Sequence, residues 1–313
     1  MSDLQFEKHY FSLNEYMYKQ FGGKVYKLAL NSSCTCPNRD GKVGTGGCIF
    51  CSNGGSGDFA PPADWDFDQQ IEWAKENLSS KLKNNKDVKY MAYFQSFSNT
   101  YGDLDFLEKL YKKALSYDDI VAISIATRPD CIDKKVVEML KRLNEIKPVW
   151  LELGLQTIHE KSEDLIRRGY GLDLYDNAVK MLNEAGLEII THLILGLPNE
   201  NKDMMLQSVK YVCNSGIKGI KLHLLHVLKD TDLAKYYNEN AFKIMTLDEY
   251  CSLLGEIIQT IPKNIVIHRL TGDGPKKLLI EPKWSADKKN VLNHIHKFFK
   301  DNNIYQGKLI NMD

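Results

Sequence analysis

The sequence predicts an α/β protein, a partial (β/α)6 TIM-like barrel capped by a C-terminal α/β extension. Two observations predict this fold class. Short β-rich runs alternate with longer amphipathic segments about six times along the 313 residues, a pattern typical of parallel sheets covered by helices. Polar residues also follow several of the apolar runs directly, as they do in barrels that bind ligands at the carboxyl ends of their strands.

Six runs rich in Val, Ile, Leu or Tyr are the predicted strands, because buried parallel strands read as nearly continuous apolar segments. They span residues 24–30, 89–95, 120–127, 149–156, 188–195 and 219–225. The predicted helices between them span residues 66–82, 104–116, 134–145, 174–185 and 202–215. Gly186 and Gly216 stand where helix C-caps are expected, and Asp173 and Asn201 are the predicted N-caps. Right-handed crossovers between such units give a partial barrel.

From about residue 230 the alternation fades. We therefore expect residues 1–230 to form the barrel with its N-terminal segment and residues 231–313 to form the extension. Within the extension, the pattern predicts a helix at 246–259, a short strand at 264–268 and a terminal helix at 287–302. Two further segments, 222–229 and 268–275, place polar side chains where a substrate could be held.

Charge and hydropathy limit the functional classes. Lys+Arg and Asp+Glu both number 41, so the overall charge predicts neither a nucleic-acid-binding tail nor a membrane-surface protein, although it leaves room for a local basic patch. The N-terminus has no apolar signal core, and no stretch of about 18 apolar residues could span a bilayer. These features predict a cytoplasmic protein with no membrane partner. In that reducing compartment, closely spaced cysteines indicate metal binding or catalysis rather than disulfides.

Three cysteines on one Gly-rich loop, Cys36, Cys48 and Cys51, are the strongest chemical signal. Only two residues separate Cys48 from Cys51, so both sulfurs can turn toward one centre, and the glycines before them let the backbone fold back toward Cys36. An iron-sulfur cluster held by three thiolates leaves one iron open. In radical enzymes that open iron binds S-adenosylmethionine (SAM).

A structural zinc site is the alternative, because Cys34 supplies a fourth sulfur and four cysteines in two pairs can form a tetrahedral centre. The chain would then be a zinc-stabilised module that binds RNA or another partner. The tight Cys34-x-Cys36 spacing and the position of the loop directly after the first strand argue against this interpretation. The two metals differ in their need for Cys34, which a closed zinc site requires and an open cluster does not.

Glu152 and His192 stand out because each lies inside an otherwise apolar predicted strand. An uncompensated polar group there would cost on the order of several kcal/mol, so both side chains are predicted to face the barrel mouth, with a satisfied core histidine as the competing interpretation of His192. Other candidates follow the strands at residues 95–100, 127–130, 156–157 and 196–200. Strand-to-helix loops are polar in any case, so position alone does not assign them.

Taken together, these residues resemble the radical SAM superfamily, in its YhcC-type branch that is similar to the radical SAM domain of the Elongator catalytic subunit. The resemblance runs almost end to end. It is carried by residues 24–25, 36–41, 46–51, 95–101, 124–131, 152–156, 167–169, 192–198 and 221–226. It implies that Cys36, Cys48 and Cys51 ligate a [4Fe-4S] cluster to which SAM binds.

The resemblance also implies a set of SAM contacts. Phe50 and the backbone of Gly196, Leu197 and Pro198 would meet the adenine. The methionyl end would contact Gln95, Ser96 and Asn99, and the carboxylate or ribose would contact Thr127, Arg128, Glu152 and Gln156. No catalytic side chain is identified.

An enzymatic reaction follows from the same resemblance. A one-electron donor such as flavodoxin or ferredoxin would reduce the cluster, SAM would be cleaved to a 5′-deoxyadenosyl radical, and this radical would abstract hydrogen from the substrate. Related branches act on tRNA wobble uridines, so the implied substrate is a uridine side chain in tRNA, with a small molecule or peptide as the alternative. Basic candidates for tRNA contact are Arg142, Lys147, Arg167, Arg168, Lys276, Lys277, Lys288 and Lys289.

Overall fold

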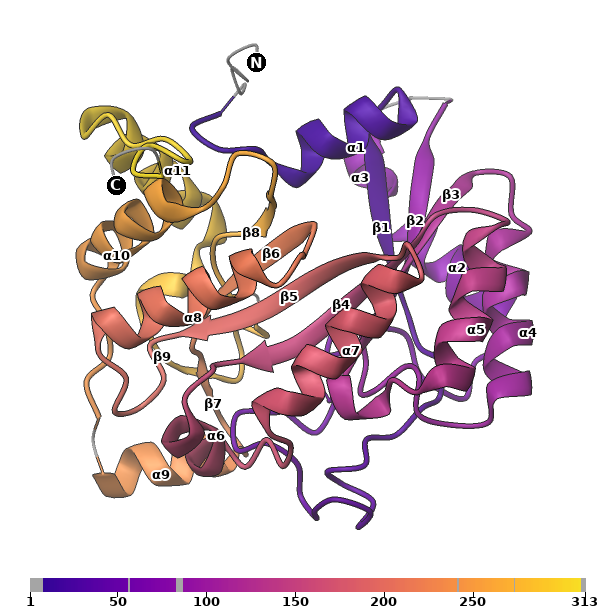
Figure 1. Cartoon of the computed structure of the whole chain (residues 1–313), viewed down its shortest axis with the longest axis horizontal. Coiled ribbons are helices and arrows are strands. Elements are labelled where there is room, and N and C mark those ends of the chain that lie inside the picture. The colour runs from indigo at the N-terminus through magenta and orange to yellow at the C-terminus, as the bar shows by residue number, and fades with distance from the viewer. Residues whose placement is uncertain (1–7, 56, 83–86, 241, 273, 311–313) are drawn as a thin grey trace.

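The computed structural model describes residues 8–55, 57–82, 87–240, 242–272 and 274–310. Seven parallel strands form one sheet in the order β1-β2-β3-β4-β5-β6-β8, which curls into a half-barrel (Figure 1). The strands are β1 (Val25–Leu30), β2 (Lys89–Phe94), β3 (Ile120–Thr127), β4 (Val149–Gln156), β5 (Glu188–Leu195), β6 (Gly219–Leu224) and β8 (Val266–Arg269). The six predicted barrel strands are confirmed.

Amphipathic helices cover the outer face of this sheet (Figure 1). They are α2 (Phe67–Glu76), α4 (Leu104–Leu115), α5 (Lys134–Asn144), α7 (Leu172–Glu184) and α8 (Lys202–Asn214). The predicted capping residues of α8 are confirmed, because the Asn201 side chain accepts a hydrogen bond from Met204 N at 3.0 Å and Gly216 follows the helix with a left-handed φ of 89°. Gly186 plays the same role after α7, with a φ of 69°.

Two helix predictions were wrong in detail. The segment 66–82 contains two helices, since α2 ends before Asn77 and the shorter α3 (Ser79–Leu82) follows. The Leu78 N–H bonds to the carbonyl of Lys75, three residues back, at 3.0 Å, which tightens the chain out of α-helical geometry. Asp173 is not the N-cap of α7, because Gly171 holds that position. Asp173 lies in the first turn instead, where its negative charge interacts favourably with the positive end of the helix dipole.

The short strand predicted in the extension, now β8, joins the barrel sheet. It pairs in parallel with β6 and makes the sheet one strand wider than predicted. The N-terminal segment lies on its other side, where Ser12 bridges to Ile267. The helix α1 (Leu13–Phe21) then crosses the N-terminal end of the barrel, and its Met17 is buried against the strands there.

The rest of the extension divides between two locations. Helices α10 (Leu247–Thr260) and α11 (Lys288–Asp301) pack on each other beside α8 (Figure 1). In contrast, β7 (Val227–Leu228) pairs antiparallel with β9 (Leu279–Glu281), and together with α6 (Glu160–Ile166) and α9 (Asp232–Asn240) they lie near the cysteine loop. No helix in the described part of the chain is long and apolar enough to cross a membrane.

Candidate active site at the mouth of the barrel

The inward-facing side chains of the half-barrel form three layers, because alternate residues of a strand point to the same face. The first layer, at the N-terminal end, is apolar and contains Val25, Met91, Ala122, Trp150 and Ile190. Two residues further along each strand is a polar layer, formed by Lys27, Tyr93, Ser124, Glu152 and His192. Two residues further still, Gln95, Ala126, Gly154, Ile194 and His223 line a cavity that opens toward the strand C-termini. The apolar layer closes the barrel beneath the polar one.

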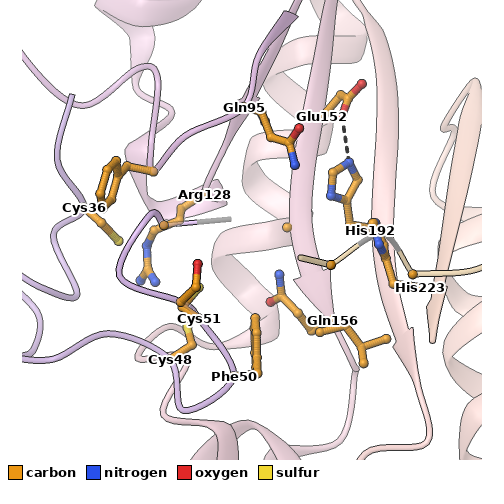
Figure 2. Close-up of a pocket in the computed structure, with 18 of the residues that line it drawn as sticks. Cys36, Cys48, Phe50, Cys51, Gln95, Arg128, Glu152, Gln156, His192 and His223 are labelled. Carbon is orange, nitrogen blue, oxygen red and sulfur yellow. Dashed lines mark hydrogen bonds and ion pairs between the residues drawn. The ribbon is translucent and has the colours of Figure 1, made fainter. Parts of the chain in front are cut away.

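Cys36, Cys48 and Cys51 line one side of this cavity (Figure 2). The loop is fixed around Asn38, whose side-chain amide donates to the carbonyl of Arg167 at 2.7 Å and to the sulfur of Cys48 at 3.5 Å. The pKa of the Cys48 thiol is raised, first by a hydrogen bond with Cys51 and second by burial. The two sulfurs therefore lie beside each other, as the Cys-x-x-Cys spacing predicted.

Cys34 lies elsewhere, since it does not line the cavity and packs against the main hydrophobic core. Among the described residues, no three His, Cys, Asp or Glu side chains lie close enough together to hold a single metal ion. The ligands of a cubane cluster bind different iron atoms and so stand further apart than the ligands of one ion. A loop with three cysteines facing one cavity fits a three-thiolate cluster, and the position of Cys34 does not suit a four-sulfur zinc centre.

A pair of arginines, Arg128 and Arg168, also lines the cavity. The guanidinium of Arg128 is held by Asp130 at 2.7 Å and 2.8 Å, and both Arg128 and Arg168 lie over the ring of Tyr170, at 4.8 Å and 4.5 Å. The positive charge of Arg128 opposes the rise in the pKa of the Cys48 thiol and so favours its thiolate form. Arg128 is thereby placed to stabilise the negative charge of thiolate ligands.

Glu152 is the centre of the polar layer and is fully buried. One carboxylate oxygen accepts from Lys27 at 2.9 Å and from Ser124 at 2.7 Å. The other oxygen accepts from His192 at 2.9 Å and from Lys221. Burial raises the pKa of Glu152, but the charges of Lys221 and Lys27 and the bond to His192 outweigh it and hold the pKa well below its usual range. Glu152 is therefore an ionised carboxylate with four donors.

Because of His192 in the same polar layer, we expect the folded protein to lose stability as the pH falls. Burial, followed by the charge of Lys221, lowers the pKa of His192 from 6.5 to about 4. Between these values the unfolded chain binds a proton that the folded chain does not, so stability falls as the pH falls from 6.5 toward 4, by about 3 kcal/mol for this one group. Burial also lowers the pKa values of His223 and His268, which adds to the loss. Urea denaturation of anaerobic protein between pH 7 and pH 5 measures this slope.

His192→Gln is the control for that prediction, because glutamine does not titrate in this range. The variant should lose less stability than the wild type over the same pH interval. An identical pH dependence in both proteins would contradict the assignment to His192.

The structure brings only some of the predicted SAM-contacting side chains to the cavity. Those that line it are Phe50, Gln95, Thr127, Arg128, Glu152 and Gln156, and Figure 2 shows Gln95 and Gln156 between the cysteines and His192. Gln156 has a φ of 67°, which turns the end of β4. Gly154 makes room for this turn, since a Cβ there would lie 2.7 Å from Gln156 Nε2.

Five predicted residues are not among those lining the cavity, namely Ser96, Asn99, Gly196, Leu197 and Pro198. Asn99 is fully buried, and its side chain donates to the carbonyls of Phe94 and Ala126 at 3.1 Å and 2.7 Å. Leu197 packs in the hydrophobic cluster that contains Ile49 and Leu233. In this structure these two residues shape the surrounding loops.

Several cavity residues were not predicted from the sequence. Tyr93 lies in a strand predicted only as an apolar run, yet its hydroxyl accepts from Lys221 at 3.0 Å and it lines the cavity. Arg39 donates to the carbonyl of Ser52 at 2.6 Å and so ties the cysteine loop to the chain that follows it. The glycine at position 47 is required here, because its φ is 81° and a Cβ would lie 2.8 Å from Arg39 Nε. The Gly-rich composition of the loop was the signal for this close approach.

The prediction that Arg168 belongs to a basic surface for tRNA contact was wrong. Its side chain is buried and donates to Glu163 and to the carbonyls of Leu155 and Thr157 at 2.6 Å each. Arg142 pairs with Glu108, Arg167 with Asp232, and Lys147 donates to two carbonyls. Three of the remaining lysines are exposed, namely Lys276, Lys277 and Lys289.

Sequence comparison identifies the family. The model of the radical SAM superfamily matches residues 33–212, and that of the radical SAM C-terminal domain matches residues 217–301. Protein YtqA of Bacillus subtilis (strain 168) is 43% identical over 96% of this chain and 93% of its own length. Protein YhcC of Escherichia coli (strain K12) is 32% identical over 93% of this chain and 92% of its own.

More distant relatives share part of the chain. A tRNA uridine(34) acetyltransferase of Methanocaldococcus jannaschii is 25% identical over 59% of this chain and 34% of its own length. The solved structure of Methanocaldococcus infernus Elp3 superposes with a TM-score of 0.67 at 18% identity, covering 90% of this chain and 64% of that one. This likeness shows a common fold. The chain belongs to the radical SAM superfamily, whose members use a [4Fe-4S] cluster and S-adenosylmethionine.

Proposed function

We propose that this chain modifies the side chain of a uridine in tRNA, with Cys36, Cys48 and Cys51 as the cluster ligands. The observation that carries the proposal is that all three cysteines line the same cavity as the polar side chains of β4, β5 and β6. A cluster on these thiolates would supply the electron that splits SAM into methionine and a 5′-deoxyadenosyl radical, the species that takes hydrogen from substrate.

The residues of the chain would orient SAM and exclude water. Phe50, Gln95, Thr127 and Gln156 line the same cavity as the cysteines and are the candidates for binding SAM. The cover formed by β7, β9 and α9 packs against the cysteine loop, where Leu233 N donates to the carbonyl of Ile49 at 2.8 Å. Such a cover limits quenching of a reactive intermediate by solvent.

The tRNA substrate is supported by the relative named tRNA uridine(34) acetyltransferase and by the exposed lysines Lys276 and Lys277. These two lysines follow the cavity-lining Gly274 closely in the chain, so a phosphate backbone bound to them would pass near the cavity. A one-electron donor such as flavodoxin or ferredoxin is the proposed redox partner. A cytoplasmic location would give the enzyme access to both.

Two measurements test the halves of this proposal separately. Anaerobic, cluster-loaded protein with SAM and dithionite should release 5′-deoxyadenosine and methionine. Nucleosides digested from tRNA of cells with and without the protein should differ in one modified uridine, and a Cys51→Ala copy should not restore the wild-type profile. An unchanged profile would contradict the tRNA substrate, and absence of 5′-deoxyadenosine would contradict the radical chemistry.

A further inference from the structure

His192 presents two different ring nitrogens to its surroundings. Nε2 is 2.9 Å from the carboxylate of Glu152, deep in the polar layer. The ring also lines the cavity, and Nδ1 has no hydrogen-bond partner among the residues that the structure describes. Figure 2 shows the ring extending from β5 toward Glu152, with Gln95 and Gln156 to one side of it. One nitrogen is therefore anchored and the other faces the space for ligands.

Glu152 fixes the tautomer of this imidazole. An ionised carboxylate only accepts hydrogen bonds, and three further donors already hold Glu152 in the ionised form. His192 must therefore carry its proton on Nε2 and donate it to Glu152. In the neutral ring this leaves a lone pair on Nδ1, directed at the cavity.

The surroundings of His192 keep the lone pair on Nδ1 free of a proton at neutral pH. Burial, followed by the charge of Lys221, lowers the pKa of His192 to about 4, so the ring is neutral at pH 7. The ring of His223 lies 5.1 Å away, tilted by 47°, and the buried Nε2 of His223 has no hydrogen-bond partner among the described residues. A buried imidazole nitrogen without a partner is costly, which indicates that this part of the cavity is shaped for a polar group of a ligand.

We infer that His192 is a catalytic base, that Glu152 is its positioning residue, and that the substrate group beside them carries an N–H or O–H bond. The N–H or O–H bond breaks and its electron pair stays on the substrate, while the proton forms a new bond to Nδ1. The resulting imidazolium faces the carboxylate of Glu152, which stabilises the positive charge. This inference rests on the proposed function, because it assigns the substrate to the β5–β6 side of the same cavity.

The first test needs no substrate. Nitrogen-15 NMR of histidine-labelled, cluster-loaded protein at pH 7 should show His192 as the neutral tautomer protonated on Nε2, with the signal assigned by its loss in His192→Gln. In Glu152→Gln the fixed tautomer should be lost, because an amide both donates and accepts. A wild-type ring protonated on Nδ1, or on both nitrogens, would overturn the inference whatever the enzyme's substrate is.

The second test measures conversion of tRNA isolated from cells that lack the protein. His192→Gln keeps an N–H donor for Glu152 but has no base, so single-turnover conversion should fall about 100-fold or more. Its iron content and its urea midpoint should stay those of the wild type. His294→Gln is the matched control, since His294 on α11 also bonds a carboxylate, that of Asp248 at 2.9 Å, but lies exposed. It should convert tRNA at the wild-type rate.

Either of two outcomes would overturn the role of His192, namely wild-type conversion by His192→Gln or loss of its iron together with its activity. The second outcome would mean that the side chain supports the cluster rather than the substrate. Failure of the wild-type protein to cleave SAM is a separate result, which would count against the proposed function, while the tautomer measurement would still decide the geometry.

Discussion

Replacing Cys48 with alanine is expected to remove the iron-sulfur cluster and to reduce 5′-deoxyadenosine formation to the level measured without protein. Cys48 lies beside Cys51, accepts a hydrogen bond from Asn38 and is exposed to the positive charge of Arg128. Loss of its sulfur would leave two thiolates, which do not hold a cubane cluster with one open iron. Iron and sulfide per chain, the visible absorbance of anaerobic protein and the amount of 5′-deoxyadenosine measure the effect.

Cys34→Ala is the matched control. Cys34 belongs to the same loop region, but its side chain packs against the hydrophobic core rather than the cavity. The variant should keep the wild-type iron content and SAM cleavage. Loss of metal in Cys34→Ala, together with zinc in place of iron in the wild type, would instead support a four-sulfur centre.

The largest expected effect on stability comes from Glu152→Leu. This change removes the carboxylate that neutralises Lys27 and Lys221. Among the described residues, it leaves the buried Lys221 ammonium with only the hydroxyl of Tyr93 to accept a hydrogen bond. Breaking a buried ion pair by removing one partner typically costs about 3–5 kcal/mol. Urea denaturation of anaerobic protein measures the loss.

A double variant shows how much of the stability loss in Glu152→Leu comes from the uncompensated charge of Lys221 and how much from changed packing. Adding Lys221→Met to Glu152→Leu removes the uncompensated ammonium, so part of the stability should return. Glu138→Leu on the exposed face of α5 is the surface control and should change the stability by about 0.5 kcal/mol or less. A Glu152→Leu protein as stable as this control would show that the polar layer contributes little to the fold.

The barrel could be predicted because its strands are apolar over their whole length and its outer helices are amphipathic. Two features were not predicted, namely the helix α1 and the pairing of β8 with β6, and the reasons differ. For α1 the signals were present, since Ser12 caps Glu15 N and Gly22 ends the helix with a φ of 69°, but the helix is short. The four residues of β8 carry too little pattern to reveal that they pair with β6, since that pairing depends on contacts distant in sequence.

The candidate site was predicted unevenly for physical reasons. Cysteine spacing is local, so the sequence indicated the metal chemistry directly. Burial of a charged side chain depends on partners that its own neighbours in the sequence do not reveal, so Arg168 read as a surface residue although the carbonyls of Leu155 and Thr157 at the end of β4 hold it inside. The partners of Glu152 come from four other strands. The apolar sequence around Glu152 in β4 indicated that this carboxylate needed partners, but it could not indicate which residues they are.

The pairing of β8 with β6 limits where the chain can be cut into separately expressed fragments. The boundary predicted at residue 230 falls between β7 and α9, yet the sheet continues past it into β8. A fragment cut there would leave β6 as a bare edge with unpaired N–H and C=O groups and apolar side chains, a template on which other chains add strands. Expressed alone, the N-terminal part would therefore tend to aggregate, whereas the intact polypeptide carries its own edge protection.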